Sequence, residues 1–122
     1  MINASQLFLI ILCVIIIASG QILFKVVGLR SVDDFSAQSL LSDHVTLGTL
    51  LFALTLYMIS TFLWIHILRT VPLSTAYPFM ALSFVLVPLS SWVIFKEPMS
   101  WSDGTGATLI VLGIVLMSRG SI

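Results

Sequence analysis

Charged residues are scarce in this sequence. Only 8% of its 122 residues are Asp, Glu, Lys or Arg, whereas 59% are hydrophobic. A soluble domain carries about 25% charged residues, so this chain has too little polar surface to cover a globule in water. The composition therefore predicts an integral membrane protein. The five acidic and five basic residues cancel, and this balance gives no indication of a nucleic acid partner.

The sequence also lacks the side-chain patterns of common enzyme sites. Its one cysteine, Cys13, cannot form an internal disulfide, and we expect it to be a small buried apolar side chain. The two histidines, His44 and His66, do not have zinc-ligand spacing, and the sequence has no glycine-rich phosphate loop and no serine–histidine–acid arrangement. We therefore predict no enzymatic activity, no cofactor and no metal.

Long apolar runs are abundant. About 20 apolar residues cross about 30 Å of hydrocarbon, and a backbone in lipid must satisfy its own hydrogen bonds, which favours helices. We predict an all-α fold, a single four-helix transmembrane bundle over residues 1–122 with both termini on one side. No basic segment precedes Leu7, so the first run does not resemble a cleaved signal peptide. The predicted spans are residues 7–27, 46–68, 73–95 and 104–118.

No predicted span carries a carboxylate in its middle. All five acidic residues lie in or beside the first and third links between spans. An exporter that exchanges a cationic compound for protons needs a buried carboxylate, which pairs with the cation and takes up the proton. The absence therefore disfavours proton-coupled cation export. Basic residues are divided three to two between the two sides, a bias too small to predict the orientation in the membrane.

Polar side chains share one face at the end of the first span. Gln21 and Lys25 are four residues apart, which places them on the same side of a helix. Gly20 would allow another backbone to approach closely. Lys25 has two interpretations: it extends to the lipid headgroups, or it holds an anionic group such as a phosphate together with Gln21.

The third span contains two prolines. Pro78 and Pro88 each remove a helical hydrogen bond, so we predict one break on each side of Ser83. A helix with such breaks is expected to gate or line a cavity. Tyr77 adds a ring for packing and a hydroxyl for a headgroup. The alternative is that these prolines are ordinary for a membrane helix and that the serines bond to their own backbone.

The fourth span carries glycines seven residues apart, Gly106 and Gly113, nearly on one face. Small residues permit close helix packing in lipid, so these glycines favour a dimer contact, with packing inside the chain as the alternative. Four helices leave little room for an enclosed pathway. We therefore expect a dimer, either of two copies or with a similar small subunit.

Together these features resemble the EamA-like, small multidrug resistance branch of the drug/metabolite transporter superfamily. The resemblance lies in the four spans, in Gly20 and Lys25, in "VPLSTAYPFMAL" and "FKEP" of the third span, and in the glycines of the fourth. Within this branch the sequence is most similar to flippase subunits for undecaprenyl-phosphate aminoarabinose, in "LWIHILRTVPLSTAYP", "SFVLV" and "EPMS". The drug exporters of the branch carry a glutamate three residues before the glycine, where this chain has Ile17.

The resemblance implies a multi-pass protein of the bacterial inner membrane that moves a lipid-linked sugar between leaflets. Lys25 would then pair with the phosphate, and hydroxyl and amide groups would bond the sugar or phosphate oxygens. Glu97 would hold Lys25 or Lys96, or bind an amino group on the sugar. The substrate-binding residues predicted in this way are Gln21, Lys25, Tyr77, Ser83 and Glu97.

Two other functions stay open at this point. The first is export of small cationic or polar compounds by the same fold, which predicts a carboxylate within the membrane. The second is a non-transporting partner subunit of a membrane glycosyltransferase, for which Lys25, Gln21 and Tyr77 would be dispensable.

Overall fold

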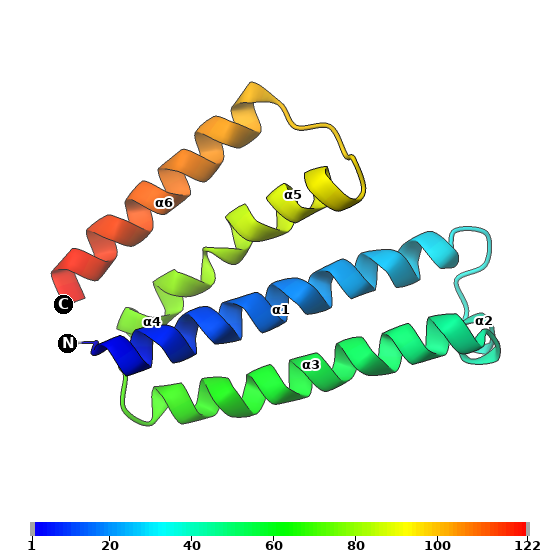
Figure 1. Cartoon of the computed structure of the whole chain (residues 1–122), viewed down its shortest axis with the longest axis horizontal. Coiled ribbons are helices and arrows are strands. Elements are labelled where there is room, and N and C mark those ends of the chain that lie inside the picture. The colour runs from blue at the N-terminus through cyan, green and yellow to red at the C-terminus, as the bar shows by residue number, and fades with distance from the viewer. Residues whose placement is uncertain (1, 122) are drawn as a thin grey trace.

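The computed structural model describes residues 2–121 as a chain of helices joined by short links (Figure 1). Four stretches are long and apolar enough to cross a membrane, and they confirm the predicted all-α fold with four spans. The third of these spans comprises two helices, α4 and α5. The helices are α1 (Ala4–Arg30), α2 (Ala37–Ser42), α3 (His44–Leu68), α4 (Leu73–Met80), α5 (Ser83–Ile94) and α6 (Trp101–Ser121).

Two helices begin three residues earlier than their apolar runs indicate, because polar caps start them. The Asn3 side chain accepts a hydrogen bond from the Gln6 N–H at 2.8 Å, and the Gln6 side chain accepts one from the Asn3 N–H at 3.0 Å. At α6, the Asp103 carboxylate accepts from the Ser100 N–H at 2.7 Å, and the Ser100 hydroxyl accepts from the Asp103 N–H at 3.2 Å. Such reciprocal pairs satisfy the free amide groups of a first helical turn.

The link between the first two spans contains the short helix α2. Its start is capped by the Ser36 hydroxyl, which accepts from the Ser39 N–H at 3.1 Å. Helix α2 has only six residues, so it is far too short to appear as a long apolar run, which is the signal that hydropathy detects. The link therefore has regular structure of its own outside the four spans.

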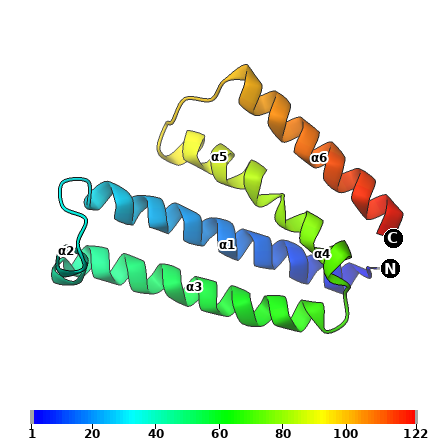
Figure 2. The same ribbon diagram turned by 180° about the vertical axis from the view of Figure 1, so that it is seen from behind.

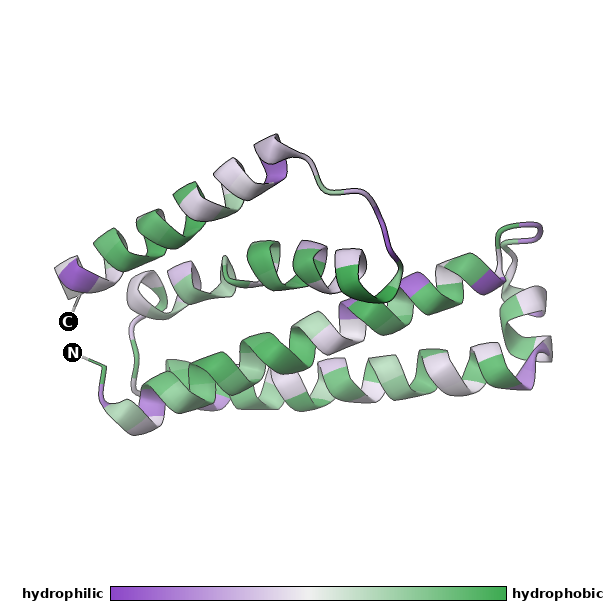
Figure 3. Ribbon diagram, turned by 45° about the horizontal axis from the view of Figure 1, so that its top comes forward, coloured by the Kyte–Doolittle hydropathy of each residue, from purple (hydrophilic) through white to green (hydrophobic). Residues whose placement is uncertain are grey.

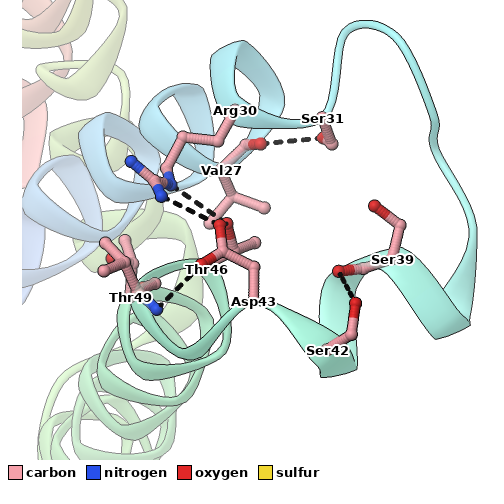
Figure 4. Close-up of polar contacts among 9 residues, drawn as sticks. Val27, Arg30, Ser31, Ser39, Ser42, Asp43, Thr46 and Thr49 are labelled. Carbon is pink, nitrogen blue, oxygen red and sulfur yellow. Dashed lines mark hydrogen bonds and ion pairs between the residues drawn. The ribbon is translucent and has the colours of Figure 1, made fainter.

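A polar cluster joins the end of α1 to the start of α3 (Figure 4). The Arg30 guanidinium donates to the Asp43 carboxylate at 2.8 Å and to the Thr46 hydroxyl at 3.0 Å. The Thr46 hydroxyl donates to the same carboxylate at 2.6 Å. These hydrogen bonds lower the pKa of Asp43 to about 2. The bond from Thr46 has the larger effect, and the bond from Arg30 has the next largest.

The third span is interrupted once, at Ala81 and Leu82, and not at each proline. Helix α5 continues through Pro88, which corrects the prediction of a break there. At the interruption the Ala81 and Leu82 amides bond three residues back, in the tighter pattern of a 3₁₀ turn. The Ser83 hydroxyl donates to the Met80 carbonyl at 2.7 Å, so the turn keeps a freed acceptor paired.

Helix α1 occupies the centre of the arrangement. It packs against α3 on one side and against α4 and α5 on the other, while α6 packs on α4 and α5 at the outer edge (Figures 1 and 2). The start of α1 and the end of α6 lie at the same end of the molecule, as four spans require (Figure 1). The main buried cluster lies near this end and comprises Ile10, Cys13, Ile67, Val71, Ala76, Phe79 and Ile114.

The outer surface suits a lipid environment. Hydrophobic residues cover the spans, and hydrophilic residues gather at helix ends and links (Figure 3). Large apolar side chains such as Phe62 and Leu116 are exposed, at 69% and 71% of their area. Cys13 is fully buried, which confirms its expected place as a small interior side chain.

Candidate functional site

The polar face of α1 contacts a tyrosine of α3. The Gln21 side-chain amide donates a hydrogen bond to the Tyr57 hydroxyl, and the Tyr57 ring stacks on Phe24 with centroids 5.1 Å apart and planes 14° from parallel. Gly20 makes this approach possible, because a Cβ atom at that position would lie 2.5 Å from Tyr57 Cε2. Gly20 therefore admits a side chain of α3, whereas the sequence predicted the approach of another backbone.

Gln21 and Ser83 line the same cavity, between α1 and α5. The cavity has a volume of about 380 Å³, and its other lining residues are Ile17, Phe84, Val87 and Pro88. Its lining is apolar apart from the amide of Gln21 and the hydroxyl of Ser83. Two residues that the sequence predicted to bind substrate are thus brought together from helices that lie far apart in the chain.

Lys25 and Glu97 form an ion pair, with Lys25 Nζ 3.1 Å from Glu97 Oε1. Each side chain is nearly half exposed, at 45% and 43%. Of the two lysines expected as partners of Glu97, the structure pairs it with Lys25. The pair joins the last two turns of α1 to the link between α5 and α6, one helical turn from Gln21.

The backbone at Lys96 directs Glu97 toward α1. Lys96 has a φ of 55°, in the left-handed region that side chains other than glycine adopt at a cost of about 1–2 kcal/mol. The Phe95 and Glu97 amides both donate to the Ser91 carbonyl, at 2.9 and 3.4 Å, and these bonds close the end of α5. A left-handed residue just after a helix reverses the chain direction.

Tyr77 does not join the other four predicted residues. It lies on α4, at the end of the molecule where α1 begins, and its ring packs edge-on against Trp64 at 6.5 Å between centroids. Its side chain is exposed at 63%. The structure therefore divides the predicted set into a Gln21–Ser83 cavity, a Lys25–Glu97 pair and a separate tyrosine.

Pro88 and Gly106 both line a second cavity, of about 360 Å³, between α5 and α6. This cavity shares Phe84 and Pro88 with the first, so the two are adjacent. A Cβ atom added at Gly106 or Gly113 would meet no atom within 4 Å. Neither glycine is therefore required for close packing within the described chain, and their role as a dimer contact stays a prediction.

Four helical stretches of transmembrane length, with polar side chains of α3, α5 and the following link placed near Gln21 and Lys25 of the first span, define a small multi-span membrane protein. The chain belongs to the EamA-like transporter family, whose model matches residues 7–119. This finding agrees with the resemblance that the sequence motifs indicated. No solved structure matches the chain.

Curated relatives have more specific names. The chain is 31% identical over 114 residues to "Probable 4-amino-4-deoxy-L-arabinose-phosphoundecaprenol flippase subunit ArnF" of Proteus mirabilis, covering 86% of this chain and 85% of the relative. It is 30% identical to the ArnE subunit of the same organism over 114 residues, 93% of this chain and 97% of the relative. With ArnE of Enterobacter sp. the identity is 39% over 70 residues, which cover 57% of this chain and 65% of the relative.

Sequence reasoning missed Tyr57. This residue of α3 contacts Gly20, Gln21 and Phe24 of α1. A signal was present, because Tyr57 carries a polar hydroxyl near the middle of the second span. Polar groups at such a depth are costly and are functional candidates by default.

Proposed function

We propose that this chain is a subunit of a flippase that moves a lipid-linked sugar phosphate, such as an undecaprenyl phosphate sugar, between the leaflets of the bacterial inner membrane. The observation that carries the proposal is the placement of Lys25. It is a cation near the edge of the first span, one turn from the Gln21 cavity, and its ion-pair partner Glu97 lies outside the spans.

The charges of the spans favour an anionic cargo. The middles of the spans contain no carboxylate that would hold a cationic compound. At the position where drug exporters of the resembling branch carry a glutamate, Ile17 lines the cavity with an apolar side chain. An ammonium group near an amide suits a phosphate joined to a sugar, because phosphate and sugar oxygens accept hydrogen bonds from both. The Ser83 hydroxyl donates its hydrogen to the Met80 carbonyl, so its oxygen offers an acceptor to a sugar hydroxyl.

The ion pair can be opened at small cost. Both side chains are nearly half exposed, and exposed pairs contribute about 0–1 kcal/mol to stability. A phosphate would replace the Glu97 carboxylate at Lys25. Glu97 would then be available to bind an ammonium group where the sugar carries one.

A second small subunit completes the proposed pathway. The described cavities lie between neighbouring helices of a four-span chain, and α6 packs on α4 and α5 at one edge (Figure 2). A copy of this chain or a similar subunit would cover the α1–α5 cavity, with Gly106 and Gly113 of α6 as the contact. The relatives are themselves named as subunits, which supports assembly with a partner.

Reconstitution in liposomes tests the proposal. The protein, alone and with a similar small subunit, is expected to move labelled undecaprenyl phosphate pentose between leaflets and to leave a quaternary ammonium compound untransported. Transport of the ammonium compound without lipid movement would show an exporter. A chain that moves neither, yet stabilises a lipid glycosyltransferase in the same membrane, would be a non-transporting partner subunit.

A further inference from the structure

Tyr57 is fixed against the polar face of α1 by three separate contacts. Its ring lies over Gly20 and stacks on Phe24, and its hydroxyl accepts the hydrogen bond from Gln21. Each contact restrains a different degree of freedom of the side chain. The hydroxyl is therefore held in one place, near the middle of α3, beside a residue that lines the α1–α5 cavity.

The pair has unused hydrogen-bonding capacity. A tyrosine hydroxyl has one hydrogen to donate, and among the described residues the Tyr57 hydroxyl acts only as an acceptor. The side-chain carbonyl oxygen of Gln21 is also unused, because it accepts no hydrogen bond from another described side chain. Water satisfies such groups on a soluble protein, but in the hydrocarbon region an unpaired donor or acceptor is costly.

We propose that Tyr57 is a specificity-determining residue, and that the Tyr57 hydroxyl and the Gln21 carbonyl together bind a hydroxyl group of the transported headgroup. This inference rests on the proposed function. A sugar hydroxyl both donates and accepts, so it pairs with the free O–H of Tyr57 and the free carbonyl of Gln21. A phosphate without its own hydrogens only accepts, so it pairs with one of them and leaves the other unpaired.

The spacing along α1 orients the headgroup. Gln21 and Lys25 are separated by four residues, or about 6 Å along a helix axis. That distance is comparable to the width of one sugar ring. The phosphate would thus lie at Lys25, toward the membrane edge, and the sugar at Gln21 and Tyr57, deeper in the membrane. Tyr57 would distinguish a glycosylated lipid phosphate from the bare one, whereas Lys25 would bind both.

Binding to the full-length protein in lipid nanodiscs tests the inference. Two probes are used, undecaprenyl phosphate and undecaprenyl phosphate pentose. Tyr57→Phe keeps the ring contacts and removes the hydroxyl, and we expect it to weaken binding of the glycosylated lipid about tenfold. Its affinity for bare undecaprenyl phosphate should stay within twofold of wild type. Thr55→Val is the matched control, since Thr55 lies on the same helix with an exposed hydroxyl bonded to Leu51 of its own backbone.

The outcomes separate this inference from the proposed function. If Tyr57→Phe weakens both lipids equally, or neither, the specificity role is overturned even when the wild-type protein transports lipid. If the wild-type protein prefers the glycosylated lipid, loses that preference in Tyr57→Phe and moves no lipid in liposomes, the inference stands and the flippase proposal fails. A wild-type protein that binds neither lipid overturns both.

Discussion

Replacing Gly20 with alanine should force α1 and α3 apart. The new Cβ atom would lie 2.5 Å from Tyr57 Cε2 and 2.9 Å from Cδ2, whereas unstrained carbon atoms stay about 3.5–4.0 Å apart. The ring would have to retreat by about 1 Å, against its stack on Phe24 and its hydrogen bond with Gln21. Overpacking of this kind costs about 1–3 kcal/mol.

Gly28→Ala provides the matched control for Gly20→Ala. It lies on the same helix, and an added Cβ atom there meets nothing within 4 Å. Both substitutions gain about 1 kcal/mol of helix propensity, so their difference isolates the contact with Tyr57. Equilibrium unfolding in mixed detergent micelles should show Gly20→Ala less stable than Gly28→Ala by about 1–3 kcal/mol.

A double substitution checks the cause of that difference. In a Tyr57→Leu background the ring is gone, so Gly20→Ala should become neutral or stabilising. Equal free energies of unfolding for Gly20→Ala and Gly28→Ala in the otherwise wild-type protein would refute the close approach of Tyr57 to α1.

Three further predictions concern the polar contacts. Because the pKa of Asp43 falls to about 2 in the folded protein, its contribution is complete above the unfolded pKa of about 3.9 and is lost as pH falls through about 2. The difference in melting temperature between wild type and Asp43→Asn should therefore shrink as pH falls from about 4 toward about 2 and vanish only below about 2. Glu97→Gln should change the free energy of unfolding by less than about 1 kcal/mol. It should strengthen binding of undecaprenyl phosphate in nanodiscs, because Lys25 loses its ion-pair partner. Unchanged binding would contradict competition between the Glu97 carboxylate and the phosphate for Lys25. Ser83→Ala should speed amide hydrogen exchange at the interruption of the third span, whereas Ser90→Ala, within uninterrupted α5, should not; equal exchange would contradict the bridging role of the Ser83 hydroxyl.

The spans were predictable because lipid imposes strong constraints on a chain. A membrane requires long apolar helices, so the four runs indicated the all-α fold without further detail. The helix starts were less accurate, since Asn3 and Ser100 lie outside the apolar runs. Their partners three residues later carried a capping signal that hydropathy does not measure.

The break in the third span depends on more than proline. Pro78 and Pro88 remove the amide donors to the Ser74 and Phe84 carbonyls, yet the interruption lies at neither proline but at Ala81 and Leu82. There the Ser83 hydroxyl donates to the Met80 carbonyl, which the tighter turn leaves without its helical partner. This choice depends on local geometry, and so the sequence could not place the interruption at Ala81 and Leu82.

The site was predictable in its chemistry and less so in its arrangement. Gln21 and Lys25 share a face through helical periodicity alone. Their association with Ser83 and Glu97 requires the packing of α5 on α1 and the left-handed turn at Lys96. Tyr77 lies elsewhere because it follows the second link, which sits at the end of the molecule where α1 begins, whereas Lys25 and Glu97 lie beside the first and third links at the other end. The order of the spans already implied this separation.

The account depends most directly on Lys25 as the phosphate-binding group. Translocation of labelled undecaprenyl phosphate pentose should be measured in liposomes with wild type, Lys25→Ala and the charge control Arg69→Ala, which lies at the opposite end of the molecule. The account predicts that translocation falls at least tenfold in Lys25→Ala and is retained in Arg69→Ala, at equal protein insertion. Wild-type translocation by Lys25→Ala would contradict it.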